Sequence, residues 1–243
     1  MVANSTRFSC AALLIAGVAS SAANADTPVL PDVQINLYVD GDLYQYDPST
    51  QQAWGNPNGT FGFFGSASAN VADSGHQMSW DMLVNPDPFI IANIVYTNIS
   101  SSTQNVTLEF VLPIGMSMSS SLIGGSVSGS LTDVNGDGAN FSAIDGGSAY
   151  QARADGSTAA GMLTGANVNA GPFGSSLIGP ESFGTPIPSL PYGAINFDMA
   201  IRYEFSLTAG DSVSLAGSFV AVPAPGAVAL LGIAGLVGRR RRR

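Results

Sequence analysis

The stretch that decides the fold is INFDMAIRYEFS, which runs from Ile195 to Ser206. Apolar residues occupy its odd-numbered positions, and polar or small residues occupy the even-numbered ones. Because successive side chains of a strand point to opposite faces of a sheet, this alternation predicts a strand with one buried face. The expected buried residues are Ile195, Phe197, Met199, Ile201, Tyr203 and Phe205.

The same alternation recurs elsewhere in the chain. Residues 33–39 alternate, and Asp40-Gly41 then predicts a tight turn into 43–46, because both residues tolerate a positive φ. No segment of comparable length has a helical period. We therefore expect an all-β fold, an antiparallel β-sandwich of the Greek-key or jelly-roll kind, over residues 26–221. Further strands are expected at 78–84, 89–97, 105–112, 126–134, 140–144 and 212–221, with long surface loops or irregular strands at 47–75 and 146–194.

The charge of the chain argues against nucleic acid as a partner. Charged residues make up 10% of the sequence, and lysine is absent. Residues 26–221 hold all 17 acidic residues against two arginines, Arg153 and Arg202, which gives a net charge of −15. Nucleic-acid binding depends on Lys and Arg side chains that neutralise phosphates, and this segment has almost none.

The first 25 residues have the three parts of a secretory signal peptide. Arg7 supplies a basic start, residues 10–18 an apolar run, and residues 23–25 a small-residue end. This order predicts export through the secretory translocon and cleavage by signal peptidase before Asp26. The exported chain then has no cysteine, so its stability must come from its own apolar core.

Residues of the kind that carry reaction chemistry are few. His76 is the single histidine, and the DSGHQ stretch around it predicts a loop histidine and not a catalytic one. No nucleophile-elbow, zinc-protease, phosphate-loop or dinucleotide-binding motif occurs in the sequence. We therefore expect a protein that is not an enzyme, and a hydrolase that uses two carboxylates is the least favoured alternative.

One motif is typical of cation binding. In DVNGDGAN, Asp133, Asn135 and Asp137 stand at alternate positions before a glycine, as in the loops that wrap calcium. The position where such a loop has its bidentate glutamate holds Ile144 instead. The sequence therefore favours a plain hairpin turn between two strands. Calcium at the three oxygen donors is the alternative, and no other cofactor is expected.

Several aromatic residues could stack on sugar rings from a surface loop. Aromatic residues of strands are more often buried in the core, so the core is the favoured interpretation. The candidates for stacking are Trp54, Phe61, Phe63 and Phe64 of the FGFFG stretch, and Trp80.

The chain ends in VPAPGAVALLGIAGLVGRRRRR. Residues 226–238 are apolar or small, and this run is shorter than the ~18 residues of an ordinary membrane span. We expect a single hydrophobic helix with the arginine cluster on the cytoplasmic side, which leaves the acidic body outside. The cluster comprises Arg239, Arg240, Arg241, Arg242 and Arg243.

This tail resembles the PEP-CTERM protein-sorting signal, which has a Pro-x-Pro box, a short apolar helix and a terminal arginine cluster. The box here is Val222-Pro223-Ala224-Pro225, with Ala224 where the family usually has glutamate. The resemblance covers residues 222–243. It implies transient retention in the inner membrane, processing near the box by an exosortase-type membrane protease, and delivery to the cell surface or an extracellular matrix. Unrelated bodies share this tail, so it does not specify an activity.

Taken together, the patterns predict an exported, non-enzymatic structural or adhesive protein of the cell surface or the extracellular matrix. The alternative is a carbohydrate-binding module that acts on extracellular polysaccharide through the aromatic residues named above.

Overall fold

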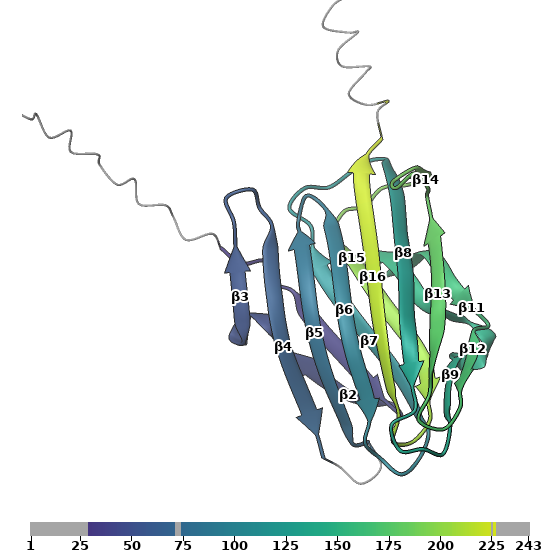
Figure 1. Ribbon diagram of the computed structural model, residues 1–243. Helices are drawn as coiled ribbons and strands as arrows, with labels where there is room; N and C mark the ends of the chain where they lie inside the picture. The colour runs from purple at the N-terminus through teal and green to yellow at the C-terminus, as the bar shows by residue number, and fades with distance from the viewer. Residues whose placement is uncertain (1–28, 71–73, 225, 227–243) are drawn as a thin grey trace, which may run out of the picture.

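The computed structural model describes residues 29–70, 74–224 and 226, whose strands form two antiparallel sheets lying face to face (Figure 1). The front sheet runs in the order β13 (Ser175–Phe183), β8 (Ser121–Thr132), β16 (Ser212–Pro223), β6 (Phe89–Asn98), β5 (His76–Asn85), β4 (Phe61–Ala69) and β3 (Gln52–Gly55), with β14 (Leu190–Tyr192) paired to β8. The back sheet runs in the order β11 (Ser157–Thr164), β10 (Ser148–Ala154), β15 (Asp198–Leu207), β7 (Gln104–Pro113), β1 (Gln34–Val39) and β2 (Asp42–Tyr46). Two further strands belong to the back sheet: β9 (Ala139–Ala143) pairs with residues 205–207 of β15, past the end of its pairing with β10, and β12 (Asn167–Ala170) pairs with β9. Short 3-10 turns form at Pro48–Thr50 and Ile144–Gly146. The all-β fold expected from the alternation is confirmed.

The core lies between the two sheets, and buried tyrosines join them. The Tyr203 hydroxyl, from the back sheet, donates a 3.1 Å hydrogen bond to the Ala92 carbonyl oxygen of the front sheet. The Tyr150 hydroxyl donates at 2.7 Å to the Ser218 carbonyl oxygen in the same way. Gly217 makes room for these rings, because a Cβ there would lie 2.3 Å from the Tyr203 hydroxyl oxygen. Each buried hydroxyl therefore keeps a hydrogen-bond partner across an otherwise apolar interface.

The hairpin expected at Asp40-Gly41 is confirmed. Asp40 has a φ of 51° and Gly41 a φ of 95°, and the turn joins β1 to β2 with Val39 opposite Asp42. Positive φ at both central residues gives the turn a twist that matches the twist of the strands.

The deciding strand is confirmed from Met199 onward, but its first part differs from the expectation. Phe197 is 71% exposed. Ile195 is fully buried, as expected, but it pairs only in an isolated bridge with Met118. The Asp155 carboxylate accepts backbone N–H groups of Asn196 and Phe197, so these groups bond to a side chain and not to a neighbouring strand. Of the six residues expected to be buried, Phe197 is the one that is exposed, and it lies just before the paired strand β15 begins at Asp198.

The two stretches expected as long surface loops or irregular strands contain strands, and two of these are irregular: the register shifts between Ala152 and Arg153 of β10 and between Ile178 and Glu181 of β13. Residues 47–75 contribute β3 and β4, and residues 146–194 contribute β10 to β14. Strand β10 lies inside the back sheet, between β11 and β15. Its inward positions are filled partly by alanine, and small residues give only a weak apolar alternation. The expectation of surface loops was wrong for that reason.

Other expectations fall outside the described residues. These are the signal peptide at 1–25, Pro225 of the box, the hydrophobic helix apart from Gly226, and the arginine cluster. Within the described part of the chain, no helix has the length and apolar character needed to cross a membrane.

Candidate functional site

The cation-binding motif forms a crossing between the two sheets. Residues 133–138 leave β8 of the front sheet and enter β9 of the back sheet, and these strands pair with other neighbours. The expected hairpin turn is therefore wrong, because the motif changes sheets instead of reversing within one. The Asp133 side chain is buried, and its Oδ1 accepts the Gly136 N–H at 2.9 Å. Its Oδ2 accepts the N–H groups of Gly138 at 3.1 Å and Phe173 at 2.7 Å.

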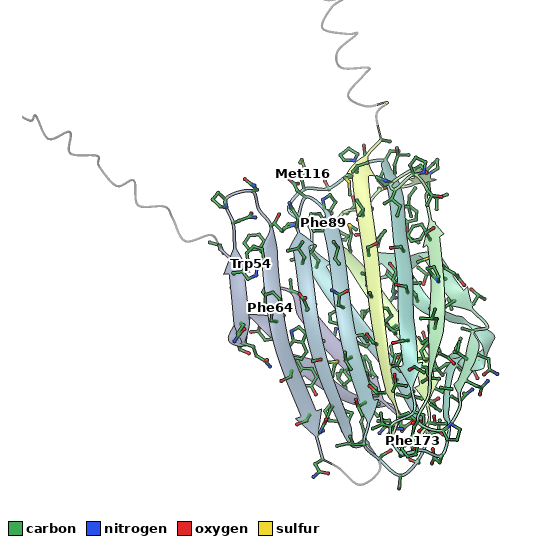
Figure 2. The ribbon with its side chains drawn as sticks, in the orientation of Figure 1. Trp54, Phe64, Phe89, Met116 and Phe173 are labelled. Carbon is green, nitrogen blue, oxygen red and sulfur yellow. The ribbon has the colours of Figure 1, made fainter. Side chains whose placement is uncertain are left out.

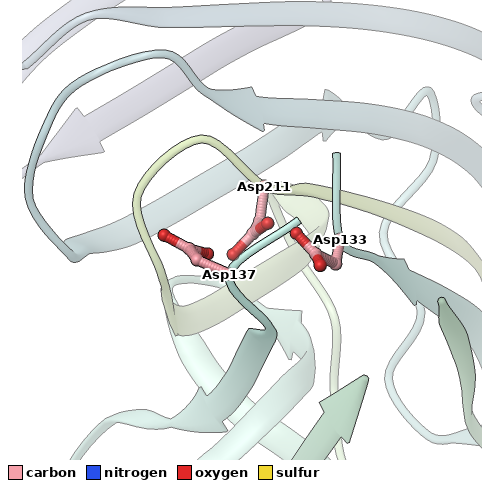
Figure 3. Close-up of side chains that lie close together, drawn as sticks. All are labelled: Asp133, Asp137 and Asp211. Atoms are coloured by element: carbon pink, nitrogen blue, oxygen red, sulfur yellow. The ribbon is translucent and has the colours of Figure 1, made fainter. Parts of the chain in front are cut away.

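Three carboxylates meet at this crossing (Figure 3). Ligand atoms of Asp133, Asp137 and Asp211 lie within 4.8 Å of one another. The side chain of Asn135, the third expected ligand, makes two hydrogen bonds at the crossing: its Oδ1 accepts the Asp137 N–H, and its Nδ2 donates to the Ala209 carbonyl oxygen. Sequence reasoning missed Asp211 because the turn before β16 brings it to the crossing from far along the chain.

The carboxyl groups of Asp133 and Asp211 have opposite pKa shifts. Burial acts to raise the pKa of Asp133, but the three backbone hydrogen bonds outweigh it and hold that pKa below its ordinary value. Burial raises the pKa of Asp211, and the nearby Asp133 carboxylate raises it further. Three accepted hydrogen bonds use most of the lone pairs of the Asp133 carboxylate. The main role of the Asp133 carboxylate is therefore to hold the backbone of the crossing in place.

The five aromatic candidates for sugar stacking separate into two groups. Trp54 is 43% exposed and Phe64 is 37% exposed, and both lie on the outer face of the front sheet, at the β3–β4 edge (Figure 2). The Trp54 indole lies over Gly62, where a Cβ would come within 2.2 Å of Nε1. The others are buried core residues, as the favoured interpretation expects: Phe61, Phe63 and Trp80.

The outer face of the front sheet is poor in charge and rich in hydroxyl groups. Among the outward positions of β4, β5, β6, β8 and β16, Asp81 is the single charged residue. A shallow hollow of about 400 Å³ lies over β4, β5 and β6. Serine and threonine fill many of the outward positions: Ser66, Ser68, Ser79, Thr97, Ser126, Ser128, Ser130, Thr132, Ser212, Ser214 and Ser218.

A second hollow, of about 610 Å³, lies on the outer face of the back sheet. Arg153 and Arg202 both line it, and they are the two arginines of residues 26–221. Sequence reasoning missed this site because its residues come from four strands. The sequence did offer one sign of it: Arg202 stands at an outward position of the alternating stretch 195–206.

His76 is a strand residue and not a loop residue, so that expectation was wrong. It begins β5, is fully buried, and its ring stacks on Tyr96 with centroids 5.9 Å apart. Its Nε2 lies 3.1 Å from the Tyr46 hydroxyl oxygen, and its Nδ1 lies 3.0 Å from the Ser74 carbonyl oxygen. Burial lowers the pKa of His76, which favours the neutral ring. These contacts give the histidine a structural role.

The Pro-x-Pro box begins inside the front sheet. Val222 pairs with Leu122 and Pro223 with Ser121, as the last residues of β16. The Ala224 N–H then donates a 3.0 Å hydrogen bond to the Ser120 carbonyl oxygen. Strand pairing therefore continues past residue 221, where the body was expected to end.

No known protein family matches the chain, and no curated protein is significantly similar to it in sequence.

Proposed function

We propose that the protein is an exported, non-enzymatic β-sandwich of the Greek-key or jelly-roll kind that adheres to material at the cell surface or in the extracellular matrix. The adhesive surface is the outer face of the front sheet. The secretory translocon exports the chain, and signal peptidase removes the signal peptide. The tail anchors the chain transiently in the inner membrane, and an exosortase-type membrane protease then cleaves it.

The observation that carries this proposal is the composition of the outer face of the front sheet. Large apolar side chains are exposed on it beside a single charge, Asp81. Few charges need to be desolvated when such a face is covered, and the centres of protein interfaces are likewise depleted of charge. Short Ser and Thr side chains also lose little conformational freedom on contact. The exposed apolar residues are Trp54, Phe64, Ile91, Val95 and Leu177.

Charge insertion tests the adhesive face. We expect Ser79→Arg and Ser214→Arg, both at exposed outward positions, to release the protein from isolated surface matrix. The matched control is Ser157→Arg on β11 of the back sheet, which is also exposed. Retention of the two front-sheet variants, with unchanged thermal unfolding, would place adhesion elsewhere.

A second candidate is a carbohydrate-binding module, favoured by the exposed rings of Trp54 and Phe64 on this same face. Aromatic rings offer a broad apolar surface at little conformational cost, which suits the face of a sugar ring. We expect Trp54→Ala and Phe64→Ala to abolish co-sedimentation with insoluble polysaccharide from the matrix. Phe197→Ala, an exposed aromatic residue outside the front face, is the control.

A further inference from the structure

The hollow on the outer face of the back sheet has the features of a built polar site. It has a volume of about 610 Å³, within the range of about 300–1,000 Å³ typical of small-molecule pockets. Strands β1, β7, β10 and β15 and the β1–β2 turn contribute to it. We call it the back-sheet hollow, and its main side chains are Tyr38, Asp40, Asn105, Glu109, Arg153 and Arg202.

The two arginines of the back-sheet hollow differ in their contacts. Arg153 is engaged by protein groups, because its Nη1 bonds to Glu109 Oε1 and its Nη2 to the Gly156 carbonyl oxygen. Arg202 lies opposite Glu109 in the strand pairing, but its charge partner is Glu204, with Nε 3.4 Å from Oε2. That Nε is buried and has no hydrogen-bond partner in the described structure. The Nε of Arg153 is buried without a partner in the same way. The difference lies in the Nη groups: those of Arg153 are bonded to protein groups, whereas those of Arg202 make no hydrogen bond to the described residues and are the donors left for a ligand.

Acceptors and an aromatic ring stand near these donors. Asp40 uses Oδ1 to accept the Asn105 N–H at 2.9 Å, and among the described residues its Oδ2 has no hydrogen bond. The Asn105 Oδ1 accepts from the Ser206 hydroxyl, which leaves its amide NH₂ as a donor. Tyr38 is 38% exposed and presents its ring at the same hollow. A ligand that both donates and accepts hydrogen bonds and has an apolar face, as a sugar does, matches these groups.

We propose that the back-sheet hollow binds a neutral saccharide unit. Sugar hydroxyls match the mixed donors and acceptors, with Arg202 donating and Asp40 accepting, and a sugar ring face can lie on Tyr38. Within the hollow, Arg153 and Arg202 balance Asp40 and Glu109. A uronate would add an unbalanced negative charge near Glu204, on a body that already carries −15. The site is separate from the front-sheet face proposed for adhesion.

Titration calorimetry of the purified full chain tests this proposal. The probes are neutral gluco-, manno- and galacto-oligosaccharides. Oligouronates of matched length are the negatively charged probes used for comparison. We expect at least one neutral series to bind more tightly than its oligouronate counterpart. Arg202→Gln should weaken that binding about tenfold or more, because it removes a charge-assisted hydrogen bond. Tyr38→Ala should weaken it as well, while Tyr38→Phe should keep the ring and most of the affinity.

Thermal unfolding of each variant shows whether a loss of binding reflects a loss of folding. Trp54→Ala is the control for location, because its ring lies on the opposite sheet. The proposal is overturned if no neutral probe binds, if oligouronates bind more tightly, or if folded Arg202→Gln and Tyr38→Ala proteins keep full affinity. Loss of binding in Trp54→Ala alone would also overturn it and would support the front-sheet module instead.

Discussion

The Asp133 carboxylate accepts a 2.7 Å hydrogen bond from the backbone N–H of Phe173, 40 residues further along the chain. The same carboxylate accepts the N–H groups of Gly136 and Gly138 in its own loop. One buried side chain thus joins the crossing between the sheets to the loop that precedes β13. Buried backbone groups that lose their partners are costly, so this carboxylate fixes both loops.

We expect Asp133→Ala to lower the melting temperature to a similar extent with calcium and with a chelator, because three N–H groups lose their acceptor in both conditions. Asp137→Ala, at an exposed position of the same cluster, should have little effect. Differential scanning calorimetry in calcium, magnesium and chelator checks this. A rise in melting temperature specific to calcium, lost in Asp137→Ala, would show instead that the cluster holds a cation.

The raised pKa of Asp211 predicts that Asp211→Asn increases the stability of the folded protein, by an amount that depends on pH. The carboxyl group of Asp211 stays protonated to a higher pH in the folded protein than in the unfolded chain. The contribution of Asp211 to stability therefore falls as pH rises above the ordinary pKa value of 3.8. The lowered pKa of Asp133 acts in the opposite sense and costs stability only as pH falls below 3.8. We expect the Asn variant to be more stable than the parent at neutral pH but not below 3.8. Urea unfolding across this range measures the difference, and a uniform loss of stability would contradict it.

Gly217 and Tyr203 should be coupled energetically. Gly217→Ala brings a Cβ to 2.3 Å from the Tyr203 hydroxyl oxygen, and overpacking of this kind costs about 1–3 kcal/mol. Tyr203→Phe loses the hydrogen bond to Ala92, at a cost of about 1–3 kcal/mol for the oxygen left unpaired. The double variant should lose less stability than the sum of the losses in the two single variants, because removal of the hydroxyl relieves the closest contact. Strict additivity in a double-mutant cycle would mean that the two sites do not interact.

Gly62→Ala tests the placement of Trp54. Its Cβ would come within 2.2 Å of the indole Nε1, so the ring must move from the sheet surface. We expect greater quenching of tryptophan fluorescence by acrylamide, with little change in stability because Trp54 lies outside the core. Weaker polysaccharide binding by this variant would support the front-sheet carbohydrate-binding module. Trp80 is buried and serves as the internal reference for an intact core.

Processing of the tail should leave Ala224 on the mature protein. Proteases generally bind substrates as extended, unpaired segments, whereas Val222, Pro223 and Ala224 are bonded to β8 or to Ser120. We therefore expect the intact mass of protein recovered from the cell surface to correspond to a C-terminus between Ala224 and Gly226. Replacement of all five terminal arginines by serine should leave uncut protein. Recovery of mature protein that still carries residues 226–243 would contradict the sorting hypothesis.

The sequence predicted the fold where the alternation was strong and failed where it was weak. Large apolar residues at every second position revealed β15 and β16, but the alanines of β10 gave too little contrast. The Asp133 loop was recognised as a turn, yet its direction depends on which strands pair, which a local motif does not encode. Asp211 and the back-sheet hollow were missed for the same reason, because residues distant in sequence meet there only after the sheets form.

The position of β16 in its sheet predicts that the body resists tension applied to its C-terminal end. It lies between β6 and β8 and is hydrogen-bonded along both of its edges, and the chain leaves it at Pro223 (Figure 1). Tension applied beyond Pro223 would act along the strand, perpendicular to the ladder hydrogen bonds. Both ladders would then resist it in shear and share the load, whereas an edge strand pulled sideways would open one bond at a time. A tether fixed to the centre of a sheet in this way would transmit force without peeling the body apart.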